Sequence, residues 1–243
     1  MNRIPIAYIE PGDPPVFPSP EHALREPDGL LAVGGDLSCE RLLQAYRHGI
    51  FPWYGEGDPI LWWSPDPRCV FDTGDVHVSR SLRKQLRRCD WTWTIDRDFD
   101  HVIAACAAPR SYAHGTWIVP SMQAAYRRLH RLGHAHSIEI RDGERLVGGL
   151  YGVAVGRLFC GESMFSAESG GSKAALLAIC HWLRMHEAPL LDAQVTNAHL
   201  MRMGARELPR ARFLASIESL VQQPTGDLWM PPGSPQAVSA LLD

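Results

Sequence analysis

Apolar residues recur every three or four positions along several stretches of the chain, a spacing that predicts amphipathic helices. The strongest pattern covers 120–132, and a second covers 39–48. The second is bounded by Ser38, a residue type favoured at helix N-termini, and by Gly49, the residue type that most often ends helices. Further helices are expected at 79–88, 98–107, 172–186 and 210–222, with a short one between the last two.

Apolar and polar residues alternate in other stretches, and this period of two predicts strands. Alternation is clear at 91–95 and on both sides of the Asp-Gly pair at 142–143, which is typical of a hairpin turn. A second turn is expected at 156–157, and the apolar run 190–195 indicates a buried strand. Helices followed by meandering strands and then by β-α-β-α predict an α+β or mixed α/β fold with a central mixed sheet.

Prolines interrupt these patterns in two places. Residues 11–20 are too rich in proline for a helix and are expected to form an extended arm. Residues 50–68 contain four prolines and three tryptophans, so they are expected to form a loop, although one too aromatic to be fully solvated. We therefore place a domain boundary here, between a small N-terminal domain at 1–64 and a larger domain at 65–243.

Composition narrows the functional classes. The 243 residues are 45% hydrophobic and 21% charged, as in ordinary globular proteins, and the formal net charge of −3 means that nucleic-acid binding would need a local basic patch. No apolar run is long enough to span a membrane and the N-terminus lacks a signal sequence, so we expect a cytoplasmic protein without membrane contacts. The six cysteines are not spaced as metal ligands and are expected to be free thiols.

One basic patch is present on an expected helix. Arg80, Lys84, Arg87 and Arg88 fall on one helical face, with Arg83 beside them. A local excess of cations in a chain of negative net charge is typical of phosphate-backbone binding. The alternative is an ordinary solvated helix face, which is weakened because acidic partners at i,i+4 are absent.

Two short motifs are less specific. GESMF at 161–165 is similar to the nucleophile elbow of serine hydrolases, but Phe165 replaces the final glycine that the tight turn needs, which argues against that class. SGGSK at 169–173 opens an expected helix whose backbone N–H groups could bind an anion, but it lacks the P-loop spacing. A plain junction between a loop and a helix explains it equally well.

Two groups of polar residues remain. His130, His134 and His136 lie close in sequence, but a glycine interrupts the helix between them, so a structural role is favoured over zinc binding. Asp192 and Gln194 are two apart on an otherwise apolar strand, so regular alternation would place them on one face. Burying them there requires partners, which makes them either a structural network or a site.

Several long and unusual strings occur in order along the chain, covering about residues 17–213. They are FPSPEHALREPDGLLAVGGDLS, AYRHGIFPW, ILWWSPDPR, HGTWIV, AYRRLHRLGHAHSIE, LVGGLYGVAVGRLFCGESMF, SK and DAQVTNAHLMRMGARELPR. Together they resemble the leucyl/phenylalanyl-tRNA–protein transferases.

The resemblance implies a small N-terminal domain and a C-terminal acyltransferase domain of the GNAT-like fold found in CoA-dependent N-acetyltransferases. It implies no metal and no organic cofactor. The implied reaction transfers Leu or Phe, sometimes Met, from aminoacyl-tRNA to the N-terminal Arg or Lys of an acceptor protein, which is thereby marked for degradation. The implied partners are therefore aminoacyl-tRNA and such acceptors, and we expect the chain to be a monomer.

The resemblance also implies roles for individual residues. Glu162 would bind the α-amino group of the aminoacyl moiety, while Asp192 and Gln194 would lie beside the reacting ester. The basic helix with Arg80, Arg83, Lys84, Arg87 and Arg88 would bind the acceptor end of the tRNA. The pocket for the aminoacyl side chain would be formed by Trp53, Trp117, Tyr126, Leu150, Phe159, Met164, Ile179 and Leu183.

This chain departs from the family pattern at four positions. A methionine is expected where Leu150 stands, and aromatic residues occur where Ile179 and Leu183 stand, so the relative preference for Leu, Phe and Met is not implied. Ala193 replaces a cysteine that is common in the DAQ motif, which excludes a cysteine nucleophile there.

The expected chemistry needs no covalent enzyme intermediate, because an aminoacyl ester is already activated and the enzyme mainly positions a free amine against it. A neutral amide is a poor base, so we expect Gln194 to orient the amine and Asp192 to bind it. Two rival functions remain. A CoA-dependent N-acetyltransferase would need a pyrophosphate loop that SGGSK does not match, and a non-catalytic RNA-binding module would leave Asp192 and Gln194 unexplained.

Overall fold

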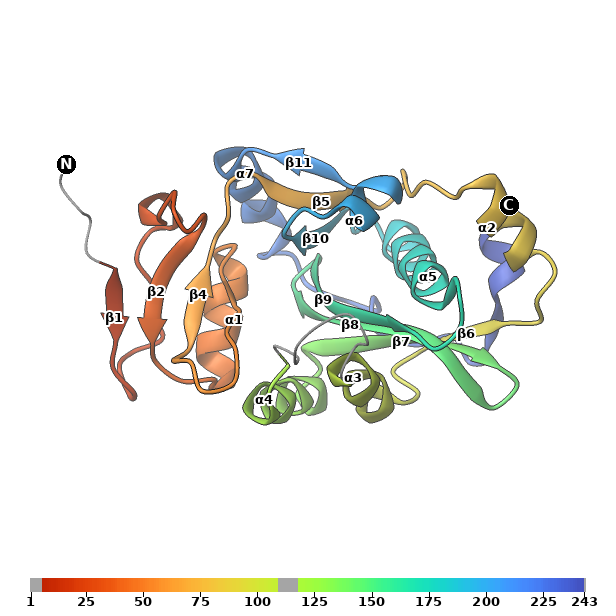
Figure 1. Ribbon diagram of the computed structural model, residues 1–243, viewed down its shortest axis with the longest axis horizontal. Helices are drawn as coiled ribbons and strands as arrows, with labels where there is room; N and C mark the ends of the chain where they lie inside the picture. Colours follow the sequence, from red (N-terminus) through yellow and green to blue (C-terminus); the bar gives the residue numbers. More distant parts are fainter. Residues whose placement is uncertain (1–5, 109–117, 243) are drawn as a thin grey trace.

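The computed structural model describes residues 6–108 and 118–242. Within them the chain forms a small four-stranded sheet and a larger eight-stranded sheet, arranged along the long axis of the molecule (Figure 1). The expected mixed α/β fold with a small N-terminal domain is thereby confirmed. All strands of the small sheet precede residue 64 and all strands of the large sheet follow it. We propose a boundary at 64/65, which this separation of the sheets supports.

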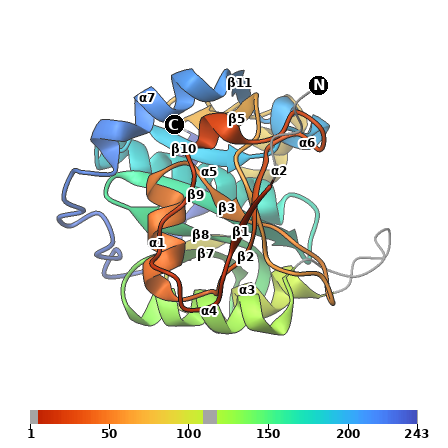
Figure 2. The ribbon, with the colours of Figure 1, turned by 90° about the vertical axis from the view of Figure 1, so that its left-hand side faces the viewer.

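The N-terminal domain places one helix against the rest of the molecule. Its sheet has the order β1-β2-β4-β3, and α1 contacts β3 as well as β8 and α4 of the larger domain (Figure 2). The expected cap of α1 is confirmed, since Ser38 Oγ accepts the N–H of Arg41 at 3.3 Å. The elements are β1 (Ala7–Ile9), η1 (Pro20–His22), β2 (Leu30–Gly34), α1 (Cys39–Arg47), β3 (Phe51–Pro52) and β4 (Leu61–Trp63).

The segment 50–68 is not the loop that its prolines predicted. It contains β3, β4 and the first residue of β5. Pro52 fits into β3 because this strand is an edge of its sheet, where a missing N–H does not interrupt a ladder. The tryptophans are also ordered, and Trp62 is fully buried with its Nε1 donating to the Gly34 carbonyl at 2.9 Å.

The large sheet has the order β11-β5-β10-β9-β8-β7-β6-β12 within the described residues. Its strands are β5 (Arg68–Asp72), β6 (Thr92–Ile95), β7 (Ala135–Asp142), β8 (Arg145–Val155), β9 (Leu158–Ser166), β10 (Leu190–Gln194), β11 (Arg206–Leu208) and β12 (Gln236–Ala237). The helices around it are α2 (Arg80–Leu86), α3 (Phe99–Ala107), α4 (Pro120–Arg131), α5 (Gly171–Met185), α6 (Ala198–Arg202), α7 (Arg210–Leu220) and η2 (Val238–Leu242).

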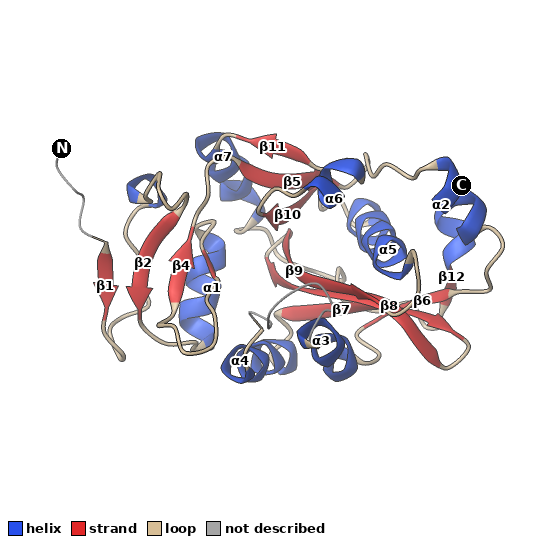
Figure 3. Cartoon of the chain, viewed as in Figure 1, coloured by secondary structure: helices blue, strands red, loops and turns tan. Residues whose placement is uncertain are grey.

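Helices cover both faces of the large sheet (Figure 3). The helix α5 packs on one face, while α3 and α4 pack on the other. Each face therefore has its own apolar core. The core on the α3 and α4 face continues into the N-terminal domain, where it includes Leu42, Tyr46 and Trp62. The two domains consequently share one core.

The expected helices and hairpins are present with small shifts. The helix α2 ends at Leu86, two residues before the expected end. The turn between β7 and β8 consists of Gly143 and Glu144, because Asp142 already pairs with Arg145 and Gly143 adopts a φ of +58°. The sequence patterns do not predict the strands β1, β2, β5, β11 and β12. None of the helices in the described part of the chain combines the length and apolar character needed to span a membrane.

The glycines of SGGSK have a packing function. Gly170 caps α5 with a φ of +93°, and Gly171 lies against Gly148 of β8. A Cβ on Gly148 would lie 2.4 Å from the carbonyl carbon of Gly171, which is closer than such atoms can approach. These residues therefore allow α5 to sit close to the sheet, in agreement with a plain junction between loop and helix.

Candidate functional site

A large cavity opens where two neighbouring strands of the sheet diverge. The parallel strands β9 and β10 pair at Leu191–Phe159 and at Asp192–Cys160, and then separate. The cavity has a volume of about 1060 Å³. Apolar side chains cover its wall on the α5 side, where Phe71, Phe159 and Leu176 lie, and polar side chains gather at the fork between the strands. This combination is typical of a small-molecule site.

Both strands carry an irregularity at this fork. In β9, Gly161 pairs with Gly152 and Ser163 pairs with Tyr151, so Glu162 is left as an extra residue without a partner on β8. In β10 the register shifts between Asp192 and Gln194, and Gln194 has a φ of +62°. A positive φ in a residue other than glycine costs on the order of 1–3 kcal/mol and is concentrated at functional sites. The bulges aim both side chains into the fork.

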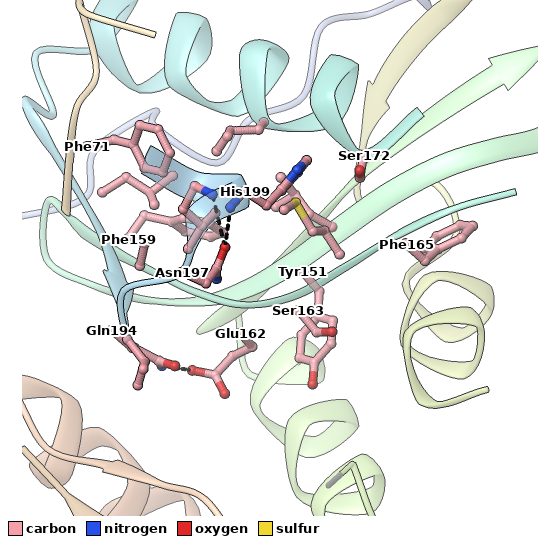
Figure 4. A pocket seen from close by; sticks show the side chains of 18 of the residues that line it. Phe71, Tyr151, Phe159, Glu162, Ser163, Phe165, Ser172, Gln194, Asn197 and His199 are labelled. Carbon is pink, nitrogen blue, oxygen red and sulfur yellow. Dashed lines mark hydrogen bonds between the residues drawn. The ribbon is translucent and has the colours of Figure 1, made fainter. Parts of the chain in front are cut away.

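Glu162 is the centre of a buried hydrogen-bond network. Its Oε1 accepts from Gln194 Nε2 at 2.7 Å (Figure 4). Oε1 also accepts from Tyr46 Oη at 2.8 Å, and Oε2 accepts from Tyr126 Oη at 2.6 Å. Burial raises the pKa of Glu162 to about 7, although these three hydrogen bonds favour the ionised form and act against the shift. Near neutral pH this carboxyl can therefore exist in either protonation state.

Asp192 lies behind Gln194 and faces a buried guanidinium. Arg68 Nε and Nη2 donate to Asp192 Oδ1 and Oδ2 at 2.8 and 2.7 Å, and both side chains are 1% exposed. Asp192 Oδ1 also accepts the backbone N–H of Gln194 at 2.9 Å. The charge pair thus holds the backbone of β10 at the position where it bends away from β9.

Comparisons with known proteins agree along most of the chain. Residues 35–66 match the family model described as the leucyl/phenylalanyl-tRNA protein transferase N-terminal domain, and residues 70–218 match the one described as leucyl/phenylalanyl-tRNA protein transferase. This chain belongs to the leucyl/phenylalanyl-tRNA–protein transferase family. A relative of that name from Xanthomonas campestris pv. campestris (strain B100) is 56% identical over 96% of this chain and 92% of its own length.

The comparisons also found a second relative from another organism and a solved structure. The leucyl/phenylalanyl-tRNA–protein transferase of Xylella fastidiosa (strain 9a5c) is 54% identical, with 90% of each chain covered. Among solved structures, L-PGS from Bacillus licheniformis aligns over 69% of this chain and 54% of its own, with 12% identity and a TM-score of 0.39. That structural similarity is too low to support an argument.

Of the eight residues that the family resemblance assigned to the aminoacyl pocket, four line the cavity. Ile179 and Leu183 are fully buried in the core beneath it and do not line it. Tyr126 is also fully buried and reaches the site through Glu162. Trp117 lies outside the described residues. The cavity is lined by Trp53, Leu150, Phe159, Glu162, Met164 and Gln194.

The position of Asp192 differs from the expectation. Asp192 is completely buried, does not line the cavity, and has both carboxylate oxygens occupied by Arg68. An amine in the cavity is therefore not in a position to bind it directly. The strand alternation that was expected to place Asp192 and Gln194 on one face is interrupted by the bulge. Asp192 instead accepts the backbone N–H of Gln194 and so helps to hold that residue in place.

Four free cations lie on the basic helix and just beyond it. Arg80 and Lys84 belong to α2, whereas Arg87 and Arg88 follow its last residue, Leu86, and are not on the helix as expected. Arg80, Lys84, Arg87 and Arg88 are exposed, and no ion pair within the described residues engages them. Arg83 is different, because it is half-buried and its Nη1 donates to the Leu242 carbonyl at 2.6 Å. The expected five-residue patch is thus reduced to four. It lies at the end of the molecule opposite the N-terminal sheet (Figure 1).

This helix is connected to the cavity through the start of α5. Gln85 on α2 donates from Nε2 to the Ser169 carbonyl in the loop before α5. Ser172, in the first turn of α5, lines the cavity. A polyanion bound along α2 could therefore extend its end into the cavity past this loop.

Two residues of the network were not anticipated from the sequence. Arg68 occurs in the ILWWSPDPR string that carries the family resemblance, which implies no role for it. Tyr46 lies on the apolar face of the helix expected at 39–48, and in the structure it is a core residue of α1. A tyrosine on the buried face of a helix needs a hydrogen-bond partner for its hydroxyl, so the sequence did indicate that Tyr46 has a polar contact.

Two of the three histidines make contacts that hold neighbouring segments together. His136 Nδ1 contacts Asp96 Oδ2 at 2.6 Å, and the ring stacks on Trp229. His130 Nδ1 contacts the Ala135 carbonyl at 2.8 Å. In the described part of the chain, no three His, Cys, Asp or Glu side chains are grouped so that they could hold a metal.

Proposed function

We propose that this chain transfers leucine or phenylalanine from aminoacyl-tRNA to the N-terminal Arg or Lys of an acceptor protein, and that the reaction takes place at the fork between β9 and β10. The observation that carries the proposal is the meeting of Glu162 and Gln194 at the head of an apolar cavity, in a member of this transferase family. The apolar wall suits a leucyl or phenylalanyl side chain. An apolar pocket distinguishes such side chains by only about 1–3 kcal/mol, so a loose preference among Leu, Phe and Met is expected.

The network supports separate roles for the two polar side chains. Glu162 accepts hydrogen bonds, and in the proposed reaction it binds the α-amino group of the aminoacyl moiety. Gln194 donates its Nε2 to Glu162, which leaves Gln194 Oε1 as an acceptor for an N–H of the attacking amine. The amine then attacks the ester carbonyl, the peptide bond forms, and the tRNA leaves with its hydroxyl restored. Positioning of this kind supplies most of what such an activated ester needs.

The remaining partners follow from this arrangement. The tRNA acceptor end binds along Arg80, Lys84, Arg87 and Arg88, and its aminoacylated terminus enters past Ser172. The chain acts as a monomer in the cytoplasm, where aminoacyl-tRNA is available, and its products are marked for degradation. No resident cofactor takes part in the proposed reaction.

A transfer assay tests the proposal directly. Radiolabelled Leu-tRNA or Phe-tRNA is incubated with two acceptor peptides that differ only in an N-terminal Arg or Ala. Label is expected on the Arg peptide alone, and Gln194→Ala is expected to abolish the transfer, whereas Gln222→Ala, an exposed glutamine outside the cavity, is not. Salt-sensitive tRNA binding without transfer to either peptide would instead favour the RNA-binding module. Acetylation of the peptides with acetyl-CoA would favour the acetyltransferase.

A further inference from the structure

Arg68 is a buried cation that the proposed mechanism does not use. Its Nε and Nη2 form a two-pronged pair with the Asp192 carboxylate, and its Nη1 donates to the Gly49 carbonyl at 3.0 Å. The rings of Phe51 and Phe213 cover the guanidinium, with centroids 4.8 and 4.7 Å from Cζ. A planar guanidinium whose three nitrogens all donate hydrogen bonds, and which also packs against two rings, is held in one orientation.

The contact between Arg68 and Asp192 fixes the position of Gln194. Asp192 Oδ1 accepts the N–H of Gln194 as well as the Nε of Arg68. This contact helps to keep Gln194 at its positive φ, with Nε2 directed to Glu162. The location of the Gln194 amide in the cavity therefore depends on Asp192, and that of Asp192 depends on Arg68.

The contact between Arg68 and Gly49 fixes the part of the cavity wall that the N-terminal domain supplies. Gly49 follows α1 with a φ of +68°, and the chain then runs through Phe51 and Pro52 to Trp53, all three of which line the cavity. The helix α1 also carries Tyr46, which donates to Glu162. A single guanidinium thus connects the wall supplied by the N-terminal domain with the wall supplied by β10.

We propose that Arg68 is a positioning residue for aminoacyl transfer, which sets the Trp53 wall and the Gln194 wall at their working separation by binding Gly49 and Asp192 together. The inference rests on the function proposed above. Arg68 does not touch substrate, since it is buried and does not line the cavity. Displacement of reacting groups by about 1 Å lowers rates on the order of 100-fold. Loss of the Arg68 contacts is therefore expected to lower kcat.

The test compares two arginines of the same burial. Arg68→Lys keeps the charge but loses the fork, and kcat for transfer to the Arg peptide is expected to fall on the order of 100-fold, with little change in KM for aminoacyl-tRNA. Arg41→Lys is the matched control. Arg41 is also 1% exposed, pairs with Asp36 at 3.2 Å and binds the Asp13 carbonyl, away from the cavity. It is expected to lose stability and keep kcat.

The pH profile separates positioning from a general loss of structure. In Arg68→Met the negative charge of Asp192 is no longer balanced, so the pKa of Glu162 rises further and the acid limb of kcat moves to higher pH. A smaller folded fraction would lower activity equally at every pH. The titratable groups that face Glu162 are Tyr46 on α1, Tyr126 on α4, Tyr151 on β8, Cys160 on β9 and Asp192 on β10.

The possible outcomes are distinct. If the wild-type chain does not transfer label, the proposed function fails. If the wild type transfers label and folded Arg68→Lys has the same kcat and pH profile, Arg68 is not a positioning residue. Should Arg68→Lys not fold, Asp192→Asn carries the same test, because it preserves shape and removes an acceptor of the fork. An Asp192→Asn variant with wild-type kcat would overturn the proposal.

Discussion

The protonation of the Glu162 carboxyl is linked to the free energy of unfolding. Its pKa in the folded protein is about 7, mainly because of burial, against an ordinary value of 4.5. Between these values the folded state keeps a proton that the unfolded chain releases, so this carboxyl makes folding less favourable as the pH rises. We expect Glu162→Gln to gain stability relative to wild type between pH 5 and 8, by on the order of 3 kcal/mol.

Urea unfolding at the two pH values measures this change. Glu218→Gln removes an exposed carboxyl on α7 and serves as the control for the loss of a carboxyl group. An unfolding free-energy difference between Glu162→Gln and wild type that is the same at pH 5 and pH 8 would show that Glu162 ionises normally in the folded state.

Two buried tyrosines on neighbouring elements provide a second comparison of single residues. Tyr126 and Tyr151 are both fully buried, and their rings pack edge to face at 5.4 Å. Tyr126 Oη donates to Glu162, whereas Tyr151 Oη has no hydrogen-bond partner among the described residues. Tyr126→Phe is therefore expected to cost about 1–3 kcal/mol of stability and to lower activity, while Tyr151→Phe is neutral or stabilising. Thermal unfolding of both variants distinguishes them, and equal losses would contradict the assigned network.

At the scale of elements, the exposed cations on α2 and just beyond it are expected to contribute charge for tRNA binding and little stability. Each phosphate that the protein no longer neutralises reduces the steepness of log K against log salt by about 0.7–0.9. Replacing Arg80, Lys84, Arg87 and Arg88 by alanine should weaken tRNA binding and flatten this slope, with little change in the melting temperature. Arg83→Ala should do the reverse, because its guanidinium binds the Leu242 carbonyl. Fluorescence titration of tRNA at several salt concentrations measures the slope. If the quadruple variant kept the wild-type slope, tRNA would have to bind elsewhere.

The elements that could be predicted from the sequence are the long periodic ones. The helix α4 has three turns of regular spacing, and β7 to β9 are separated by glycine turns, so local physics suffices for them. The strand β3 has two residues and contains Pro52, so it exists only because β4 lies beside it. The bulge at Gln194 could not be predicted either, because the argument from alternating apolar and polar residues assumes a regular strand. The pairing of Arg68 with Asp192 joins residues 124 positions apart, and no local pattern carries such information.

The whole molecule is expected to unfold as one unit although it contains two sheets. The core on the α3 and α4 face extends into the N-terminal domain, and polar contacts cross between the domains as well. Tyr54 Oη contacts Ser121 Oγ at 3.1 Å, and Arg128 donates to the Leu37 carbonyl at 3.1 Å. The reacting groups themselves depend on Tyr46 from the smaller domain. Separate unfolding of the N-terminal domain would thus open both a core and the site.

Leu42→Ala tests this coupling, because Leu42 is completely buried in the N-terminal helix α1. The cavity that it leaves should cost about 2–5 kcal/mol. If the domains are coupled, calorimetry shows a single transition that moves down by roughly 2–4 °C for each kcal/mol of lower stability, with calorimetric and van't Hoff enthalpies in agreement. A second transition at the wild-type temperature would mean that the larger domain is stable alone. Transfer activity is then expected to disappear at the temperature of this single transition. The reason is that the shared core also holds Tyr46 in its hydrogen bond to Glu162.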